Sequence, residues 1–278
     1  MGPIDRVRVR ALEGDAAVDR EDVLAVEEPL EIRIRSEERG PPFSFVTTMR
    51  TPGNDEELAA GLLFAEGVLD CRNDLIAFQR PTDPRIDSEL RANVLIATVS
   101  PGASARASRL QRGTVMGSAC GVCGKTSIEN VIPSDHPPLN AALRVSADLL
   151  YGLPETLRKR QSIFAETGGL HAAALFSTRG ELREIREDIG RHNATDKLFG
   201  TFLVRDELPL SDSILMVSGR AGFEIVQKAY AAGVPVVASI SAPSSLAVEL
   251  AQATGVTLVG FLRERRLNVY ANPERVGS

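Results

Sequence analysis

The sequence predicts an α/β protein whose C-terminal part is built around a parallel β-sheet with helices on both faces. Three short, almost wholly apolar segments, SILMVSG, VPVVASIS and VTLVGFLR, alternate with two helical segments, FEIVQKAYAAG and PSSLAVELAQATG. Each helical segment ends at a glycine, a common residue at helix C-termini. Strands that are apolar along their whole length are typical of parallel sheets covered on both faces. The order βαβαβ is therefore expected over residues 213–263.

The N-terminal part is predicted to be smaller and rich in β-structure. Apolar and polar residues alternate in EPLEIRIRS, which is the pattern of a half-buried strand. NDEELAAGLLFAEGVL is typical of a helix, because Asn54 or Asp55 can cap it and acidic residues fill its first turn. Further strands are expected within RGPPFSFVTTMRTPGND and at the end of DSELRANVLIATVS.

Between these two parts the pattern predicts a helix over 145–167, broken near Pro154, followed by two strands and a further helix from Arg191. Residues 1–22 are charged and lack a clear period, which favours a frayed start or an edge strand. The predicted parts are a flexible segment at 1–22, a β-rich subdomain at 23–112, a mobile cysteine loop at 113–136 and an α/β subdomain at 137–278.

Composition excludes several classes of protein. The formal net charge of −5 and the pI of about 5.4 argue against a binder of nucleic acid or of anionic membranes. No apolar run approaches the roughly 18–20 residues that a membrane span needs, and the charged N-terminus does not resemble a signal peptide. Three cysteines do not make a disulfide framework, so we expect a cytoplasmic protein.

The segment VMGSACGVCGKTSIEN contains the two cysteines of a CxxC motif, Cys120 and Cys123. Its flanks, PGASARASRLQRG and PSDHPP, are polar and rich in turn-forming residues, which predicts a long exposed loop. Glycines give the backbone freedom, and Lys125 places a positive charge where it would favour a thiolate.

Four kinds of chemistry are known for loops with such a motif: zinc binding, phosphate binding, dithiol redox cycling and sulfur carriage. A zinc site needs four ligands, but beyond the CxxC pair only Cys71 and three scattered histidines are available. ACGVCGKT resembles a phosphate-binding loop, yet no buried strand precedes it. Dithiol redox cycling and sulfur carriage on a thiolate both fit the motif, and the residues alone leave these two open. The plain alternative is two packed cysteines in an ordinary loop.

Seven segments, in this order, resemble one known family. The segments are EEPLEIRI, TMRTPGNDEELAAGLLFAEGVL, CGVCGK, TGGLHAAALF, EDIGRHNATDKLFG, SGRAGFEIVQKAYAAGVPVVASISAPSSLAVELA and LVGFLR, and together they run from about residue 27 to residue 272. The chain thereby resembles the formate dehydrogenase accessory sulfurtransferases (FdhD).

The resemblance implies a sulfurtransferase. In such a protein Cys120 receives sulfur as a persulfide from a cysteine desulfurase, and Cys123 assists or resolves it. The acceptor is the molybdenum cofactor in its bis(molybdopterin guanine dinucleotide) form, on its way to the formate dehydrogenase catalytic subunit. A homodimer without a permanently bound metal is expected. Competing hypotheses are a cofactor-binding chaperone without catalysis and a CxxC dithiol oxidoreductase.

The resemblance also implies a cytidine-deaminase-like, three-layer core. Zinc deaminases carry H-x-E followed by P-C-x-x-C. Here Ala172 and Ala173 follow His171, and the CxxC precedes this histidine, so deaminase chemistry is not expected. His171 itself is predicted to be a satisfied core histidine.

The cofactor is expected at the C-terminal ends of the parallel strands, where backbone N–H groups can hold phosphate. SGRAGFE and SAPSSLA are two such strand–helix junctions, and Gly219 and Arg220 belong to the first. EDIGRHNATDK is predicted to present either a solvated helical face, on which Asp188 and His192 lie together, or part of the pocket. The stretch that the resemblance assigns to cofactor binding is Phe261, Leu262, Arg263, Glu264, Arg265 and Arg266.

Overall fold

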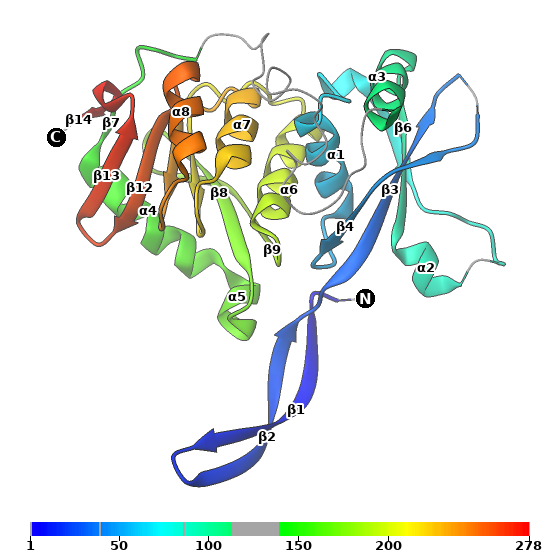
Figure 1. Ribbon diagram of the computed structural model, residues 1–278, viewed down its shortest axis with the longest axis horizontal. Coiled ribbons are helices and arrows are strands. Elements are labelled where there is room, and N and C mark those ends of the chain that lie inside the picture. The colour runs from blue at the N-terminus through cyan, green and yellow to red at the C-terminus, as the bar shows by residue number, and fades with distance from the viewer. Residues whose placement is uncertain (1, 39, 86, 113–138, 278) are drawn as a thin grey trace.

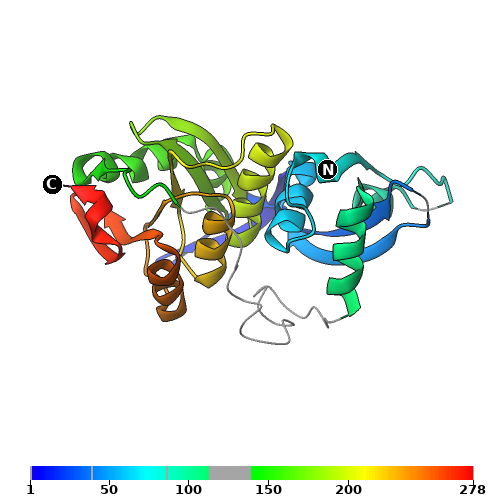
Figure 2. The same cartoon turned by 90° about the horizontal axis from the view of Figure 1, so that it is seen from above.

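The structure is a computed structural model that describes residues 2–38, 40–85, 87–112 and 139–277. It has two lobes and a projecting hairpin (Figure 1), and the view from above in Figure 2 shows the lobes side by side. The predicted CxxC loop, with Cys120 and Cys123, lies outside the described residues.

The N-terminal lobe is built on a four-stranded sheet in the order β4-β3-β6-β5. Its hydrophobic cluster joins apolar residues of this sheet to helices α1 and α3. The elements of this part of the chain are β1 (Ile4–Glu13), β2 (Ala16–Ala25), β3 (Glu28–Ser36), β4 (Phe43–Arg50), α1 (Asp55–Ala65), η1 (Arg72–Asp74), β5 (Leu75–Gln79), α2 (Ser88–Ala92), β6 (Val94–Val99) and α3 (Pro101–Arg112).

The C-terminal lobe is built on a six-stranded sheet in the order β13-β12-β11-β10-β8-β9. One face packs on α6, α7 and α8, and the other on α4, so the lobe has three layers. Its elements are β7 (Val145–Ser146), α4 (Ala147–Arg160), α5 (Ser162–Thr167), β8 (His171–Ser177), β9 (Leu182–Asp188), α6 (Arg191–Val204), β10 (Ser213–Val217), α7 (Phe223–Ala231), β11 (Val236–Ser239), α8 (Ser245–Thr254), β12 (Thr257–Arg263), β13 (Arg266–Ala271), η3 (Pro273–Arg275) and β14 (Val276–Gly277).

The predicted βαβαβ unit is confirmed, because β10, β11 and β12 pair in parallel. Antiparallel strands extend the sheet on both sides, with β13 next to β12 and β8 next to β10. Since β9 is antiparallel to β8, it runs in the same direction as β10. The carboxyl ends of β9, β10, β11 and β12 therefore share one edge with the amino end of β8.

The two lobes are joined where α1 crosses α6 with almost no space between their backbones. A Cβ atom added at Gly61 would lie 1.9 Å from the carbonyl oxygen of Asp196. One added at Gly200 would lie 1.8 Å from the carbonyl oxygen of Glu57. Only glycine permits such an approach, so these two positions fix how the lobes meet.

Two sequence-based predictions for helices were wrong. Residues 101–112, expected to be loop, form α3: the Ser100 hydroxyl accepts a hydrogen bond from the backbone N–H of Ala103 (3.3 Å), and Ala103 and Ala107 are buried one turn apart. The expected break near Pro154 is absent, since α4 continues to Arg160. Its leucine side chains at 150, 153 and 157 are buried against the sheet, and this packing outweighs the hydrogen bond that proline cannot donate.

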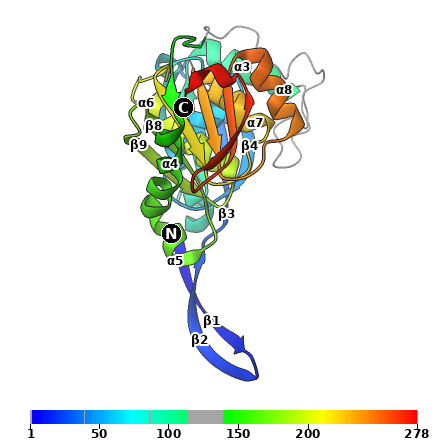
Figure 3. The ribbon, with the colours of Figure 1, turned by 90° about the vertical axis from the view of Figure 1, so that its left-hand side faces the viewer.

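Of the two alternatives expected for the N-terminus, a frayed start or an edge strand, the structure shows strands, but in a separate two-stranded sheet. β1 and β2 form a regular antiparallel hairpin from Ile4↔Ala25 to Glu13↔Ala16. It projects away from both lobes (Figure 1 and Figure 3). The sequence feature that indicates this hairpin is the pair Gly14–Asp15 between two alternating segments, and Gly14 adopts φ 61° in the turn. None of the helices in the described ranges has the length and apolar content needed to cross a membrane.

Candidate functional site

The carboxyl edge of the six-stranded sheet brings together segments that the sequence had marked separately. The backbone N–H of Ser218, just after β10, donates to the carbonyl of Ala172 in β8 (2.9 Å). Beyond β11, the backbone N–H of Phe261 donates to the carbonyl of Ser241 (3.1 Å). At the other end of the edge, His171 pairs in register with Asp188, the last residue of β9. One continuous edge therefore carries the strand–helix junctions, the start of α6 and the arginine-rich end of β12.

Gly219 and Arg220 lie at the centre of this edge, between β10 and α7. A Cβ atom at Gly219 would lie 3.3 Å from His171 Nδ1 and 3.7 Å from Arg191 Cδ, so the glycine lets three segments meet closely. Arg220 is exposed and forms no ion pair with any described residue. Backbone and guanidinium donors are thus available together at this point of the edge.

The stretch 261–266 forms the end of β12 and the turn into β13. The side chain of Leu262 is fully buried beneath α4, so only its backbone could contact a ligand. Arg265 pairs with the exposed Asp148 at 2.7 Å and lies over the ring of Tyr151. Three other residues, Arg263, Glu264 and Arg266, are exposed, and neither arginine has an ion-pair partner among the described residues. Arg263 and Arg266 therefore carry positive charge without a counter-ion among the described residues, but they lie on a solvent-exposed surface.

EDIGRHNATDK does not present a solvated helical face, which was one of the two alternatives expected for it. Asp188 ends β9, and α6 begins only at Arg191, so Asp188 and His192 do not share a helix. Asp188 is fully buried and lies 2.7 Å from Nζ of Lys197, which is 1% exposed. The Asp188 carboxylate also accepts hydrogen bonds from the backbone N–H groups of Gly190 (2.9 Å) and Thr51 (3.2 Å). Because Thr51 belongs to the N-terminal lobe and contacts both Asp188 and Lys197, this ion pair connects the two lobes.

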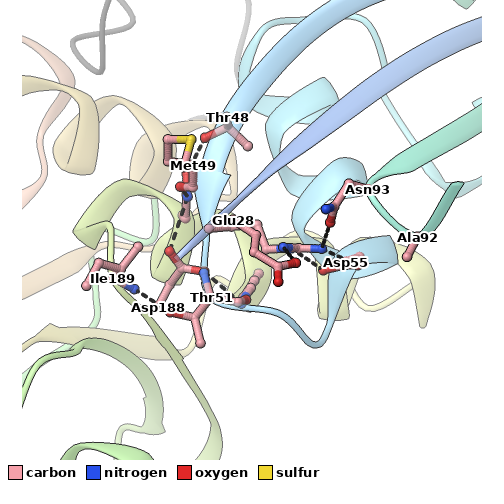
Figure 4. A network of polar contacts seen from close by, with 12 residues as sticks. Glu28, Thr48, Met49, Thr51, Asp55, Ala92, Asn93, Asp188 and Ile189 are labelled. Carbon is pink, nitrogen blue, oxygen red and sulfur yellow. Dashed lines mark hydrogen bonds and ion pairs between the residues drawn. The ribbon is translucent and has the colours of Figure 1, made fainter. Parts of the chain in front are cut away.

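A second buried ion pair continues this connection into the N-terminal lobe. The Arg50 guanidinium donates to both oxygens of Asp55, at 2.9 and 3.3 Å, and to Asn93 Oδ1 at 3.0 Å. Figure 4 shows Thr51 between Asp188 on one side and Asp55 on the other. Although burial opposes it, hydrogen bonds from Arg50 and Arg80 hold the pKa of Asp55 below its usual value. A pocket of about 470 Å³ opens here, but its buried charges neutralise one another.

Helices α6 and α7 carry a third polar group behind the edge. His192 Nδ1 lies 2.8 Å from Glu224 Oε2, and Lys228 Nζ lies 2.6 Å from Asp196 Oδ2. Burial raises the pKa of Asp196 although Lys228 opposes this, whereas the hydrogen bond from His192 holds the pKa of Glu224 below its usual value against the effect of burial. One oxygen of each carboxylate is buried without a hydrogen-bond partner in the described structure.

His171 is not a satisfied core histidine. It is half-buried at the amino end of β8, and its ring forms no hydrogen bond with the described residues. Burial lowers the pKa of His171, and Arg191 and His192 lower it further against the opposing effect of Asp188. The imidazole is therefore held neutral at the edge, where it can donate or accept a hydrogen bond.

The cysteines are only partly covered by the structure. Cys120 and Cys123 lie outside the described residues, and Cys71 is an exposed thiol before the short helix η1. The described chain resumes at Leu139, and Asn140 donates to Asp212 (3.2 Å), one residue before β10 and thus at the opposite edge of the sheet. Within the described ranges, no three His, Cys, Asp or Glu side chains are grouped as metal ligands would be.

Comparison with known proteins identifies the family. The model of the FdhD/NarQ family matches residues 25–277. The Sulfur carrier protein FdhD of Streptomyces coelicolor is 48% identical over 98% of this chain and 95% of its own length. The protein of the same name from Mycobacterium tuberculosis is 47% identical over 97% of each chain, and that from Sulfurisphaera tokodaii is 40% identical over 98% of this chain and 99% of its own.

The fold is supported by a solved structure as well. A crystal structure from Desulfotalea psychrophila, of a protein proposed to be a formate dehydrogenase accessory protein, superposes with a TM-score of 0.74 at 22% identity and covers 99% of both chains. The mixed α/β architecture is thereby confirmed, while the cytidine-deaminase-like core stays a prediction. With the family model matching residues 25–277 and relatives of 40–48% identity over nearly the whole length, this chain belongs to the FdhD/NarQ family.

Proposed function

We propose that the protein carries sulfur for formate dehydrogenase, taking it from a cysteine desulfurase and transferring it to the bis(molybdopterin guanine dinucleotide) molybdenum cofactor. The observation that carries this proposal is the CxxC pair Cys120 and Cys123 in a chain whose curated relatives are named sulfur carriers. A reachable thiolate can accept sulfur, and Lys125 places a favourable charge near it in the sequence.

The loading step requires only a thiolate and a donor persulfide. The Cys120 thiolate attacks the terminal sulfur of the donor, the donor S–S bond breaks, and the donor cysteine leaves as a thiolate. Cys120 then carries a persulfide. For release, the Cys123 thiolate attacks the inner sulfur of that persulfide, which forms a Cys120–Cys123 disulfide and frees HS⁻ for the cofactor. A cellular thiol must reduce this disulfide before the next cycle.

The carboxyl edge of the six-stranded sheet is the proposed place of the cofactor. Gly219 offers a close backbone approach, and Arg220 offers a guanidinium that has no ion pair with a described residue. The turn at 261–266 adds two arginines, Arg263 and Arg266, that are likewise unpaired within the described ranges. Phosphate groups favour both kinds of donor. We propose further that the protein works in the cytoplasm as a homodimer, loaded by the desulfurase and serving the formate dehydrogenase catalytic subunit.

Persulfide trapping tests the carrier step. The purified protein is incubated with a cysteine desulfurase and L-cysteine, alkylated, and digested for peptide mass spectrometry. Added sulfur is expected on the peptide with Cys120, and Cys120→Ala should abolish it. Cys71→Ala is the matched control, because Cys71 is an exposed thiol outside the motif, and it should keep the full signal.

Other outcomes would select a competing function. If Cys120→Ala still activates formate dehydrogenase in cells, the protein is a cofactor-binding chaperone. If the wild-type protein gains no sulfur and both motif cysteines are recovered as a disulfide that cycles with thiol reductants, it is a dithiol oxidoreductase.

A further inference from the structure

The hairpin of β1 and β2 has a long edge on β2 that no other described strand covers. The two strands form a sheet of their own, which projects away from both lobes (Figure 1 and Figure 3). β2 is ten residues long, contains no proline and pairs with β1 without a register shift. A two-stranded hairpin alone is only marginally stable in water, and a regular exposed edge can pair with a further strand. The outer edge of β2 is therefore a candidate interface.

The backbone groups of every second residue of β2 point toward this edge. The N–H of Val26 donates to the carbonyl of Pro3 (2.9 Å), and hydrogen-bonded pairs alternate along an antiparallel ladder. The even-numbered residues of β2 therefore bond to β1, and the odd-numbered residues from 17 to 25 face outward. In agreement, the N–H of Val23 donates to the carboxylate of the neighbouring Asp22 (3.0 Å). The outward groups are placed to bond to another strand.

The side chains on one face of β2 complement those of a second copy of the same strand. Val18, Arg20, Asp22 and Leu24 alternate along the strand, so they share this face. When two copies of β2 run antiparallel about a twofold axis at Glu21, Arg20 lies opposite Asp22 of the second copy. Val18 lies opposite Leu24 in the same register, and these side chains are 54% and 45% exposed in the single chain. Opposite charges and apolar groups therefore meet twice each.

The other face of β2 tolerates the same register. Glu21 meets Glu21 of the second copy on the axis, but each is paired in register with Arg8 of its own hairpin. The row across the joined sheet is then cation, anion, anion, cation. A register centred on Arg20 would instead bring the two Arg20 side chains together and place Asp19 opposite Glu21. Like charges directly opposite one another are unfavourable, so the charges select the register centred on Glu21.

The edge of β1 does not offer the same complementarity. Its arginines, Arg6, Arg8 and Arg10, occupy alternate positions and thus one face of the strand. Antiparallel pairing of two copies of β1 about a twofold axis would place arginine opposite arginine near the centre of the strand. This repulsion favours β2 over β1 as the edge that joins two copies.

We propose that β2 pairs antiparallel over residues 18–24 with β2 of a second copy of this chain, so that the two hairpins form one four-stranded sheet. This β2–β2 interface deepens the proposed function, because it assigns the contact of the proposed homodimer, and it does not depend on sulfur transfer. In this arrangement the tip of each hairpin points toward the lobes of the other copy.

Charge reversal tests the interface, with the monomer–dimer dissociation constant measured by sedimentation equilibrium on the full chain. Arg20→Asp places a carboxylate opposite Asp22 in both contacts, and we expect the dimer to weaken at least tenfold. Asp22→Arg should act alike, whereas the double variant Arg20→Asp/Asp22→Arg restores opposite charges and should dimerise within threefold of the wild type. Arg6→Asp is the matched control, since Arg6 is exposed on β1, and it should dimerise within twofold of the wild type.

A cysteine at the twofold axis tests the register directly. In a hydrogen-bonded antiparallel pair the two Cα atoms are about 5.5 Å apart, a separation that a disulfide spans. Glu21→Cys should therefore form a disulfide between two copies under mild oxidation, identified by peptide mass spectrometry. Arg8→Cys is the matched control on β1, because three strand spacings, about 14 Å, would separate its two copies, and it should not form this link.

Three results would overturn the β2–β2 interface. The first is that the wild-type protein is monomeric at the highest concentration measured, which would leave the edge of β2 to another partner. The second is that Arg20→Asp and Asp22→Arg both dimerise within twofold of the wild type while Glu21→Cys forms no link, which would place the dimer contact elsewhere. The third is that the double variant does not recover. Persulfide trapping is a separate readout: added sulfur on Cys120 in a monomeric protein would refute the interface and leave sulfur carriage standing.

Discussion

The close crossing of α1 and α6 predicts that Gly200→Ala is strongly destabilising. The new Cβ atom would lie 1.8 Å from the carbonyl oxygen of Glu57, and its second close neighbour, the backbone nitrogen of Gly61, would lie at 2.7 Å. Both neighbours are backbone atoms of α1, so no flexible side chain can move away. The two helices must therefore separate.

The size of the effect follows from this overlap. An ordinary Cβ contact is 3.4 Å or longer, so the helices have to move apart by roughly 1.5 Å, which forfeits much of the dispersion energy across the crossing. Overpacking of this kind costs about 1–3 kcal/mol and occasionally more, and the helix preference of alanine returns only about 0.4–1 kcal/mol. We expect a net loss of up to about 2.5 kcal/mol, which lowers Tm by up to roughly 10 °C for a chain of this size.

Urea unfolding followed by circular dichroism measures the loss, with Gly152→Ala as the matched control. Gly152 lies in the middle of α4, and nothing is within 4 Å of the added Cβ atom. The same chemical change should there raise stability by about 0.4–1 kcal/mol. If Gly200→Ala were as stable as Gly152→Ala, α1 and α6 would not cross as closely as described here.

Two further predictions concern buried charge. Lys197→Met leaves the fully buried carboxylate of Asp188 without its cation, so urea unfolding should show a loss of stability of about 3–5 kcal/mol. Adding Asp188→Leu removes the unpaired charge and should restore part of that stability. No recovery in the double variant would contradict the ion pair. Since burial and neighbouring cations lower the pKa of His171 in the folded protein, the unfolded chain takes up a proton first as pH falls below about 6.5. Above that pH, His171 therefore contributes stability, and this contribution is lost as the pH falls through the folded-state pKa. In thermal melts between pH 7.5 and 5, Tm should fall less steeply with pH for His171→Gln than for the wild type. An unchanged dependence of Tm on pH would contradict this assignment.

The elements that were predicted correctly are those whose signal is local. The βαβαβ unit could be identified because apolar segments and glycine-ended helices follow one another without interruption. α3 was missed because its buried face consists of small residues, Ala103 and Ala107, in a segment otherwise rich in serine and arginine. The continuity of α4 through Pro154 depended on the sheet beneath it, which local propensity does not contain.

The candidate site divides in the same way. The motif SGRAGFE predicted Gly219 and Arg220 at a strand–helix junction, and they lie between β10 and α7. The roles of Asp188 and Lys197 could not be predicted, because their pattern is also that of a polar helical face. The partner atoms of both residues include Thr51, more than 130 positions earlier in the chain, and no periodicity reveals such a pairing.

By itself, the sequence determined the α/β class, the order of most strands and helices, and the family, which the comparisons confirm. Only the tertiary structure decided which charges are buried and which are left unpaired. The physical reason is that burial and charge pairing depend on how α1 and α6 cross and on which strand ends share an edge. These are contacts between distant segments, and they turned Lys197 into part of the core while leaving the Nε atom of Arg191 without a hydrogen-bond partner in the described structure.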